Sequence, residues 1–202
     1  MRAVWITRPG GPEALEVRET ADPEPGPGQV RVRVRAAGLN FAEVMAAQGL
    51  YPDAPKPPCV VGYEVAGMVD ALGERTPGPA AGSRVLAMTH FGGHADVVCV
   101  PAEQVLQIPD AMSFEEAAAI PVNYLTAYHM LFRVAGIRPG ERVLVHMAAG
   151  GVARRYCSYA ARWAIRRSSA RHQPPSTRHC GPKAARTLST TTPPTMPPRS
   201  AG

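Results

Sequence analysis

The apolar residues of the first 110 positions come in short runs separated by turns rich in glycine and proline. Between Val30 and Arg35, valine alternates with arginine, so a strand here would bury one face and expose the other. Strands are expected at residues 2–6, 14–19, 29–39, 63–73, 83–89 and 94–101. Many short strands joined by such turns predict a small barrel over residues 1–110.

Helical spacing occurs in two other segments. Residues 40–49 are a short helix candidate that ends at Gly49. Ser113, followed three positions later by Glu116, has the pattern of a capping box, in which each side chain accepts a backbone N–H of the other residue. The apolar segment that follows predicts a helix, interrupted at Pro121 and closed by Gly136.

A different organisation begins at the buried strand expected over Val143–Met147. The next residues, Ala-Ala-Gly-Gly-Val, are small enough for a backbone to approach a phosphate, and strand, glycine turn and helix together begin a doubly wound nucleotide domain. The fingerprint Gly-x-Gly-x-x-Gly/Ala falls on Ala148, Gly150 and Ala153, with alanine in place of the first glycine. A plain strand-to-helix turn is the alternative.

The pattern is lost beyond Val152, where arginines are scattered without an acid and seven prolines occur from Pro174 onward. We expect no apolar stripe and no order over residues 153–202. The predicted fold is mainly β and then α/β. It comprises a barrel domain at 1–110, connecting helices and the first Rossmann strand at 111–152, and a basic tail at 153–202 that is predicted to be disordered.

The formal net charge of +6 is unevenly distributed. Residues 1–152 carry 12 basic and 16 acidic residues, a net charge of −4, whereas residues 153–202 carry 10 basic and no acidic residues. Because Tyr156, Tyr159 and Trp163 lie among these arginines, a nucleic-acid-binding arm is one interpretation of the tail. The first 152 residues have the charge balance of an ordinary soluble protein, which argues against nucleic acid as the main partner.

The sequence predicts a cytoplasmic protein. It has no window of about 18 apolar residues, so no membrane span is expected, and "MRAVWITRPGG" lacks the features of a secretory signal. The four cysteines, Cys59, Cys99, Cys157 and Cys180, are scattered without a CxxC pair. Free thiols in a reducing compartment are therefore expected, rather than disulfides or a zinc cluster.

Three longer blocks are more specific: "GLNFAEVMAAQGLYPDAPKPPCVVGYEVAGMV", "IPVNYLTAYHMLF" and "IRPGERVLVHMAAGGV". They resemble the zinc-less quinone oxidoreductases of the medium-chain dehydrogenase/reductase superfamily, most closely the vesicle amine transport protein-like branch. The resemblance implies a GroES-like β-barrel followed by a Rossmann domain, with the substrate and NADPH in the cleft between them. It also implies NADPH-dependent reduction of quinones or α,β-unsaturated carbonyls, and a homodimer in an intact member.

The residues at the zinc-ligand positions argue against a metal. Zinc members of the superfamily resemble "GxCGTD" and "GHE" where this sequence has Gly38-Leu39-Asn40 and Gly62-Tyr63-Glu64. Catalytic zinc needs three protein ligands and an open position, and three ligands cannot be assembled here. We expect Glu64 to have a structural role, and His90 and His94 to be solvated rather than metal-bound.

Without a metal, hydride transfer depends mainly on positioning. By resemblance, the catalytic residues are Asn40 and Tyr51, which would donate hydrogen bonds to a substrate carbonyl, and Thr126 would contact the nicotinamide amide. The cofactor turn would consist of Ala149, Gly150, Gly151 and Val152. Alternatives are a helix N-cap for Asn40, a loop aromatic packed on proline for Tyr51, and plain helix surface for Thr126.

The tail has a simpler explanation than selection for binding. Codons can be chosen for "LSTTTPPTMPP" and "SSARHQ" such that translation from two bases later gives amino-acid sequences resembling the later Rossmann part of this family. GC-rich DNA read out of frame tends to give Arg, Ala, Pro and Ser, as found here. We therefore interpret the sequence after about Val152 as frameshifted, and expect little reductase activity from this 202-residue chain. For the function of the chain, a non-catalytic binding module is the alternative to a reductase.

Overall fold

In the computed structural model, residues 1–147, 149–163, 166–167 and 189–190 are described. The chain divides into two compact units, residues 1–122 and 123–202. The domain boundaries expected from the sequence were at residues 110 and 152, so the division falls between the two.

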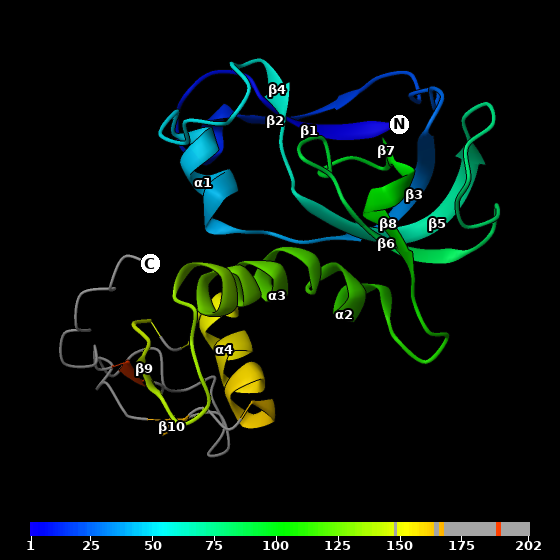
Figure 1. The fold of residues 1–202 in the computed structure, drawn as a ribbon. Helices are drawn as coiled ribbons and strands as arrows, with labels where there is room; N and C mark the ends of the chain where they lie inside the picture. The colour runs from blue at the N-terminus through cyan, green and yellow to red at the C-terminus, as the bar shows by residue number, and fades with distance from the viewer. Residues whose placement is uncertain (148, 164–165, 168–188, 191–202) are drawn as a thin grey trace, which may run out of the picture. The chain divides into compact units, whose positions relative to one another are not determined.

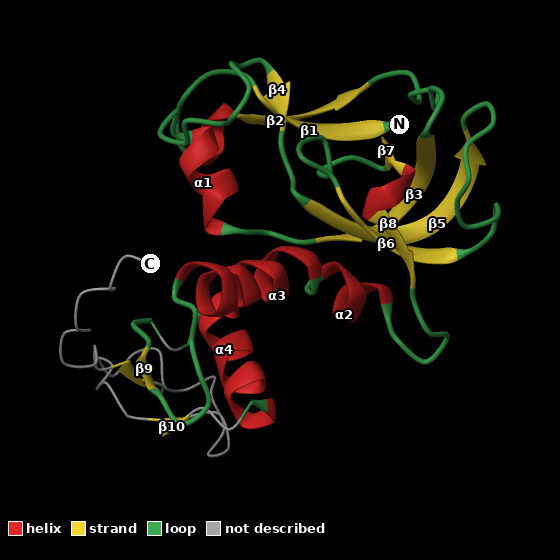
Figure 2. Cartoon of the chain, viewed as in Figure 1, coloured by secondary structure: helices red, strands yellow, loops and turns green. Residues whose placement is uncertain are grey.

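The first unit is built mainly from antiparallel strands (Figures 1 and 2). A five-stranded sheet has the order β7-β3-β5-β6-β8, and a three-stranded sheet has the order β2-β1-β4. The larger sheet contains β3 (Gln29–Ala37), β5 (Glu64–Leu72), β6 (Arg84–Met88), β7 (Val97–Pro101) and β8 (Val105–Gln107). The smaller contains β1 (Arg2–Ile6), β2 (Leu15–Glu19) and β4 (Cys59–Val60). All six expected strands are present, and β4 and β8 were not expected.

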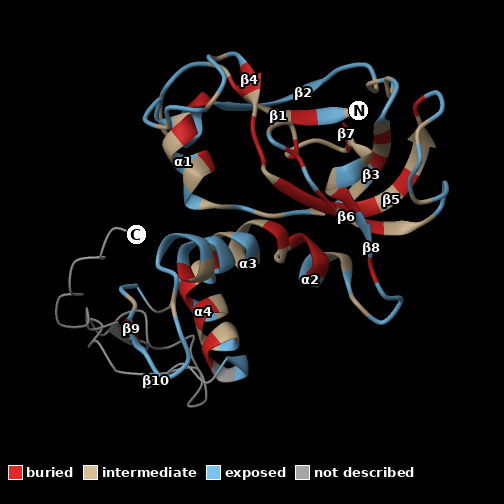
Figure 3. Ribbon diagram, in the orientation of Figure 1, coloured by how far each residue is buried: buried red, intermediate tan, exposed pale blue. Residues whose placement is uncertain are grey.

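Strand β3 shows how the valine–arginine alternation determines the core. Val30 and Val32 are fully buried in a cluster of valines from the large sheet (Figure 3). On the other face, Arg31 and Arg33 both donate to Asp70 of β5, at 3.1 and 2.9 Å. The predicted amphipathic strand is therefore confirmed, with its polar face held by ion pairs to the neighbouring strand.

Short helices connect these strands. Two single 3-10 turns, η1 (Pro12–Ala14) and η2 (Ala102–Gln104), precede β2 and β8. Helix α1 (Phe41–Ala47) follows β3, and Gly49 beyond it has a φ of 72°, a left-handed conformation that favours glycine.

The predicted capping box and the interruption at proline are both confirmed. Glu116 N–H donates to Ser113 Oγ at 3.1 Å, and Ser113 N–H donates to Glu116 Oε2 at 3.0 Å, at the start of α2 (Phe114–Ala118). Pro121 begins the next helix, α3 (Pro121–Tyr128), which continues as the π-helical segment η3 (His129–Val134). Gly136 follows with a φ of 57°, as expected for the residue that ends the helix.

The second unit has a strand, β9 (Arg142–Leu144), shorter than the predicted Val143–Met147. No order was expected over residues 153–202, yet two short strands from this range pair with β9. It pairs in parallel with β10 (Arg166–Arg167) and antiparallel with β11 (Ser189–Thr190). The remainder of the predicted disordered tail, residues 164–165, 168–188 and 191–202, lies outside the described residues.

The prediction that helical spacing ends at Val152 is also wrong. Helix α4 spans Gly151–Arg162, and its buried residues are Ala153, Tyr156 and Ala160. These positions are three and four residues apart, so they form one apolar stripe, which packs against Ala127, Leu131 and Val143. The arginines between them obscured this stripe, although the spacing was present in the sequence.

No helix within residues 1–147, 149–163, 166–167 and 189–190 is long and apolar enough to cross a membrane.

Candidate functional site

Asn40 lies where β3 gives way to α1 and makes two hydrogen bonds there. Its backbone N–H donates to Glu43 Oε2 at 2.6 Å, which is one half of a capping box at the start of the helix. Its side-chain Nδ2 donates to Glu64 Oε1 at 3.0 Å. The N-cap position expected as an alternative is therefore confirmed. Because an amide nitrogen carries two hydrogens, one donor of Asn40 is left for another acceptor.

Glu64 fixes the orientation of the Asn40 side chain. It begins β5, is only 1% exposed, and accepts a second hydrogen bond, from the backbone N–H of Val122 at 2.7 Å. Burial raises the pKa of this carboxyl, while the hydrogen bonds from Val122 and Asn40 oppose the rise. Glycine is required at position 38, because a Cβ there would overlap the Glu64 side chain.

Tyr51 belongs to an aromatic cluster in the same unit. Its ring meets that of Tyr63 edge-on at 6.0 Å, and the Tyr63 ring lies 5.4 Å from that of Phe91. Tyr51 is half-buried against an apolar cluster that includes Ile6 and Cys59. Burial raises the pKa of the Tyr63 hydroxyl, so this phenol stays protonated in neutral solution.

The residues at the zinc-ligand positions have other contacts or none. Leu39 is 76% exposed, Tyr63 is part of the aromatic cluster, and both oxygens of Glu64 accept hydrogen bonds. His90 packs edge-on against Phe91 at 4.4 Å, and His94 Nε2 lies 3.1 Å from Gly38 O. Within the part of the chain that the structure describes, no three His, Cys, Asp or Glu side chains gather in a way that could hold a metal ion.

The turn expected to hold a dinucleotide lies in the second unit, at the N-terminus of α4. Met147 has a φ of 53°, and its carbonyl accepts the N–H of Gly150 at 2.8 Å. Gly150 is the N-cap, Gly150 and Gly151 are exposed, and Ala149 and Val152 are half-buried. The first amides of a helix have no partner within it, and they suit an anion such as a phosphate.

Helix α3 approaches this turn closely. A Cβ on Gly151 would overlap the terminal amide of Asn123, so the start of α4 passes close to this side chain, which would have to shift for any larger residue. Sequence reasoning missed Asn123, although it lies in the quoted block "IPVNYLTAYHMLF", three positions before Thr126. Thr126 is half-buried on α3.

Arg155 on α4 also contacts α3. Its guanidinium carbon lies 4.4 Å from the centre of the Tyr124 ring, and the Tyr159 hydroxyl donates to Tyr124 O at 3.3 Å. Both contacts join α4 to α3 within the second unit. The arginine therefore contributes to packing, which the count of basic residues did not reveal.

Comparison with known proteins places both units in one family. Residues 26–110 match the alcohol dehydrogenase GroES-like domain family. The mouse synaptic vesicle membrane protein VAT-1 homolog-like is 48% identical over 152 residues, which cover 75% of this chain and 36% of that protein. The chain thus spans about a third of the length of this relative.

Solved structures agree. The human VAT-1 homolog-like protein matches with a TM-score of 0.79 and 45% identity, over 82% of this chain and 54% of that one. Escherichia coli quinone oxidoreductase, solved with NADPH, matches with a TM-score of 0.77 and 33% identity, over 82% and 51%. The chain belongs to the medium-chain dehydrogenase/reductase superfamily, in its VAT-1-like, quinone oxidoreductase-related branch, and combines a GroES-like domain with the start of a Rossmann-like region.

Proposed function

We propose that the protein represents an NADPH-dependent reductase that transfers a hydride to a quinone or an α,β-unsaturated carbonyl without a metal ion. The observation that carries this proposal is the fixed side chain of Asn40, whose amide keeps one donor free after bonding to the buried Glu64. The E. coli quinone oxidoreductase with NADPH supports the choice of cofactor and of substrate class.

Asn40 would serve as the donor to the substrate carbonyl. A carbonyl that accepts a hydride develops negative charge on its oxygen, and a donor held in place before the reaction stabilises that charge without reorganising. The bond to Glu64 Oε1 holds the amide in one orientation, since a carboxylate accepts only from the nitrogen end. Tyr51, half-buried beside Tyr63, would supply the second donor and an apolar wall for a ring-shaped substrate.

The residues at the start of α4 fit a dinucleotide. Ala149, Gly150, Gly151 and Val152 would hold the pyrophosphate through backbone N–H groups, and Thr126 would contact the nicotinamide amide. When bound, the cofactor supplies the hydride. The fit rests on the two exposed glycines, Gly150 and Gly151, which have no side chain of their own to cover the start of the helix.

Metal independence is part of the proposal. Leu39 and Tyr63 replace the cysteine and histidine of the zinc members, and neither offers a zinc ligand. Reduction of a quinone needs little acid catalysis, because the acceptor takes a hydride readily once it is oriented. A cytoplasmic location is also proposed, and the free thiols of Cys59 and Cys99 are consistent with it.

We expect the 202-residue chain itself to have little activity. Within the described residues, β9 pairs only with two strands of two residues each, whereas a Rossmann site is built on several longer parallel strands. A non-catalytic binding module remains the rival function, and a nucleic-acid arm is a further one. Salt-sensitive DNA binding that disappears when residues 153–202 are deleted would identify the arm.

The test uses a chain whose reading frame is restored after codon 152. NADPH oxidation with a benzoquinone and with an enone is followed for the restored chain, for its Asn40→Ala variant and for the exposed control Glu103→Gln. The Asn40 variant should lose about 100- to 1000-fold in kcat, because a donor to the developing oxyanion is removed, while the control keeps its rate. An Asn40→Ala variant with an unchanged kcat would contradict the proposed role, and NADPH binding without turnover would favour the binding module.

A further inference from the structure

Strand β2 (Leu15–Glu19) has an open edge. It is the outer strand of the sheet β2-β1-β4 and is exposed along its whole length (Figure 3). It pairs with β1 in continuous register and contains neither proline nor lysine. Bulges, prolines and lysines are the usual devices that keep an edge strand from pairing with another chain. Because β2 has none of the three, its free edge can accept a further strand.

The hydrogen bonds between β1 and β2 show which backbone groups of β2 face outward. Next to the paired residues, Met1 and Thr20 exchange both backbone bonds, at 2.7 and 2.9 Å. Bonded positions alternate in an antiparallel pair, so the residues that turn their N–H and C=O away from β1 are Leu15, Val17 and Glu19. No hydrogen bond within the described part of the chain occupies these outward groups of Val17 and Glu19.

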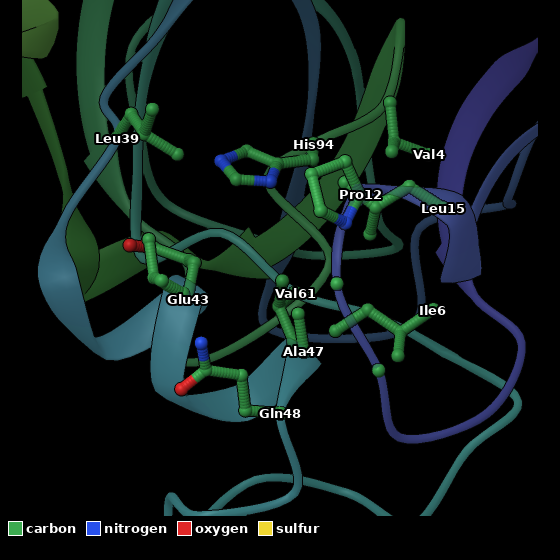
Figure 4. Close-up of a pocket in the computed structure, with 13 residues that line it drawn as sticks. Val4, Ile6, Pro12, Leu15, Leu39, Glu43, Ala47, Gln48, Val61 and His94 are labelled. Carbon is green, nitrogen blue, oxygen red and sulfur yellow. The ribbon is translucent and has the colours of Figure 1, made fainter.

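The side chains of β2 alternate between an apolar and a charged face. Leu15 and Val17 are 42% and 68% exposed, and Leu15 lines an apolar pocket that Ile6 also lines (Figure 4). On the opposite face, the guanidinium of Arg18 donates to the carboxylate of Glu16 at 2.9 Å. Val17 therefore has one negative and one positive neighbour along the strand.

These charges select one register for pairing between two copies of β2. A two-fold antiparallel pairing centred on Glu16 or on Glu19 would place two carboxylates opposite each other, and one centred on Arg18 would oppose two guanidinium groups. A pairing centred on Leu15 would need an N–H that already donates within the preceding turn. Centred on Val17, the pairing sets Glu16 of each copy opposite Arg18 of the other.

We propose that the first unit binds a second copy of this chain by pairing β2 with β2 of that copy, antiparallel and centred on Val17. The two valines exchange both backbone bonds, and each Glu19 N–H donates to Leu15 O of the other copy. The charges choose the register more than they add affinity, because exposed ion pairs contribute little. Two five-residue strands bury far less than the ~1,000 Å² of a stable interface, so we expect a dissociation constant on the order of 0.1–1 mM.

Sedimentation velocity of the full 202-residue chain, from about 20 µM to about 1 mM, measures the association. NADPH is left out, so the result does not depend on the proposed reductase activity. The average mass should rise from 21.5 kDa toward that of a dimer. Val17→Lys opposes two ammonium groups and should weaken dimerisation 10-fold or more. Val134→Lys changes a valine of similar exposure, 72%, in the second unit and should dimerise like the parent.

Cysteine pairs test the register. Opposed residues that do not exchange backbone bonds have Cα atoms about 4.5 Å apart, which suits a disulfide. A mixture of Glu16→Cys and Arg18→Cys chains should form this disulfide between copies in oxidised glutathione, and mass spectrometry of the joined peptides identifies it. Either variant alone should form a link between its two new cysteines at least 5-fold more slowly, because their Cα atoms would lie about 7–8 Å apart.

The proposal is overturned if the parent stays monomeric at about 1 mM, if Val17→Lys dimerises as tightly as the parent, or if Val134→Lys weakens dimerisation as much as Val17→Lys does. It is also overturned if each cysteine variant alone links as fast as the mixture. If Val17→Lys does not fold, the cysteine mixture decides: a preferred link between positions 16 and 18 supports the pairing, and its absence overturns it.

Discussion

Replacing Glu64 by glutamine tests how the first unit is held together at the site. Both oxygens of Glu64 accept hydrogen bonds, from Asn40 Nδ2 at 3.0 Å and from the N–H of Val122 at 2.7 Å. Glutamine has one acceptor oxygen, so one of these donors would face an amide nitrogen. A hydrogen bond to a charged group contributes about 1.5–3 kcal/mol. Removing the buried charge offsets part of the loss, so we expect the free energy of unfolding to fall by about 1–2 kcal/mol at pH 7.

The loss of unfolding free energy in Glu64→Gln should depend on pH in a definite direction. Burial raises the pKa of Glu64 in the folded protein above its ordinary value of 4.5. The folded state therefore takes up this proton more readily than the unfolded state. The stability that this proton uptake contributes is fully present below pH 4.5 and is lost as the pH rises through the folded pKa. Because glutamine does not titrate, the loss of unfolding free energy caused by Glu64→Gln should be largest near pH 4.5 and should shrink as the pH rises from there.

The assay is urea unfolding followed by tryptophan fluorescence. The chain has two tryptophans, Trp5 in the first unit and Trp163 in the second, so a Trp163→Phe background makes the signal specific for the first unit. Glu115→Gln, an exposed position on α2, is the matched control and should stay within about 0.5 kcal/mol of the parent. The reasoning is refuted if Glu64→Gln behaves like this control, or if its deficit grows as the pH rises.

Three further changes follow from the packing. Gly151→Ala should destabilise the second unit by about 1–3 kcal/mol in thermal unfolding, because the new Cβ overlaps Asn123. Adding Asn123→Ala should largely restore stability, and additive losses in the double variant would argue against that contact. Val32→Ala, at a fully buried position, should cost the first unit about 2 kcal/mol in urea unfolding, and a near-zero loss would mean that β3 is not in the core. Tyr51→Phe in the frame-restored chain should lower kcat/KM for a quinone about 3- to 10-fold with an unchanged fold; full activity would leave Tyr51 with a packing role alone.

The barrel strands could be predicted because their signal is local. The alternation of valine and arginine in β3 and the Ser113–Glu116 capping box each correspond to one physical requirement, and both appear in the structure. Strands β4 and β8 have two and three residues, too few to show a period, so their pairing is determined by their neighbours.

The start of α4 was mispredicted for a different reason. The prediction weighed the number of arginines and not the spacing of Ala153, Tyr156 and Ala160, which is sufficient for one buried apolar stripe. Because residues 151–162 form an amphipathic helix, support for a changed reading frame now comes only from the sequence beyond this helix. The frameshift itself stays a prediction, and sequencing the coding DNA around codon 153 would decide it.

The candidate site could be predicted only in part. The resemblance predicted catalytic roles for Asn40 and Tyr51, and these roles stay predictions; the structure adds that the Asn40 side chain is held by Glu64 with one donor left over. No sequence pattern indicated that Glu43 on α1 would be buried, since its burial depends on segments distant in the sequence. Such contacts between distant segments have no local signature.

The proposed reductase function is tested most sharply by comparing two chains, the 202-residue chain and the same chain with its frame restored after codon 152. NADPH oxidation with a quinone is measured at equal protein concentration, with isothermal titration of NADPH in parallel. We expect NADPH binding and quinone-dependent turnover in the restored chain, and little of either in the 202-residue chain. A restored chain that folds but neither binds NADPH nor reduces a quinone would contradict the proposed function, and equal turnover by the 202-residue chain would contradict the frameshift.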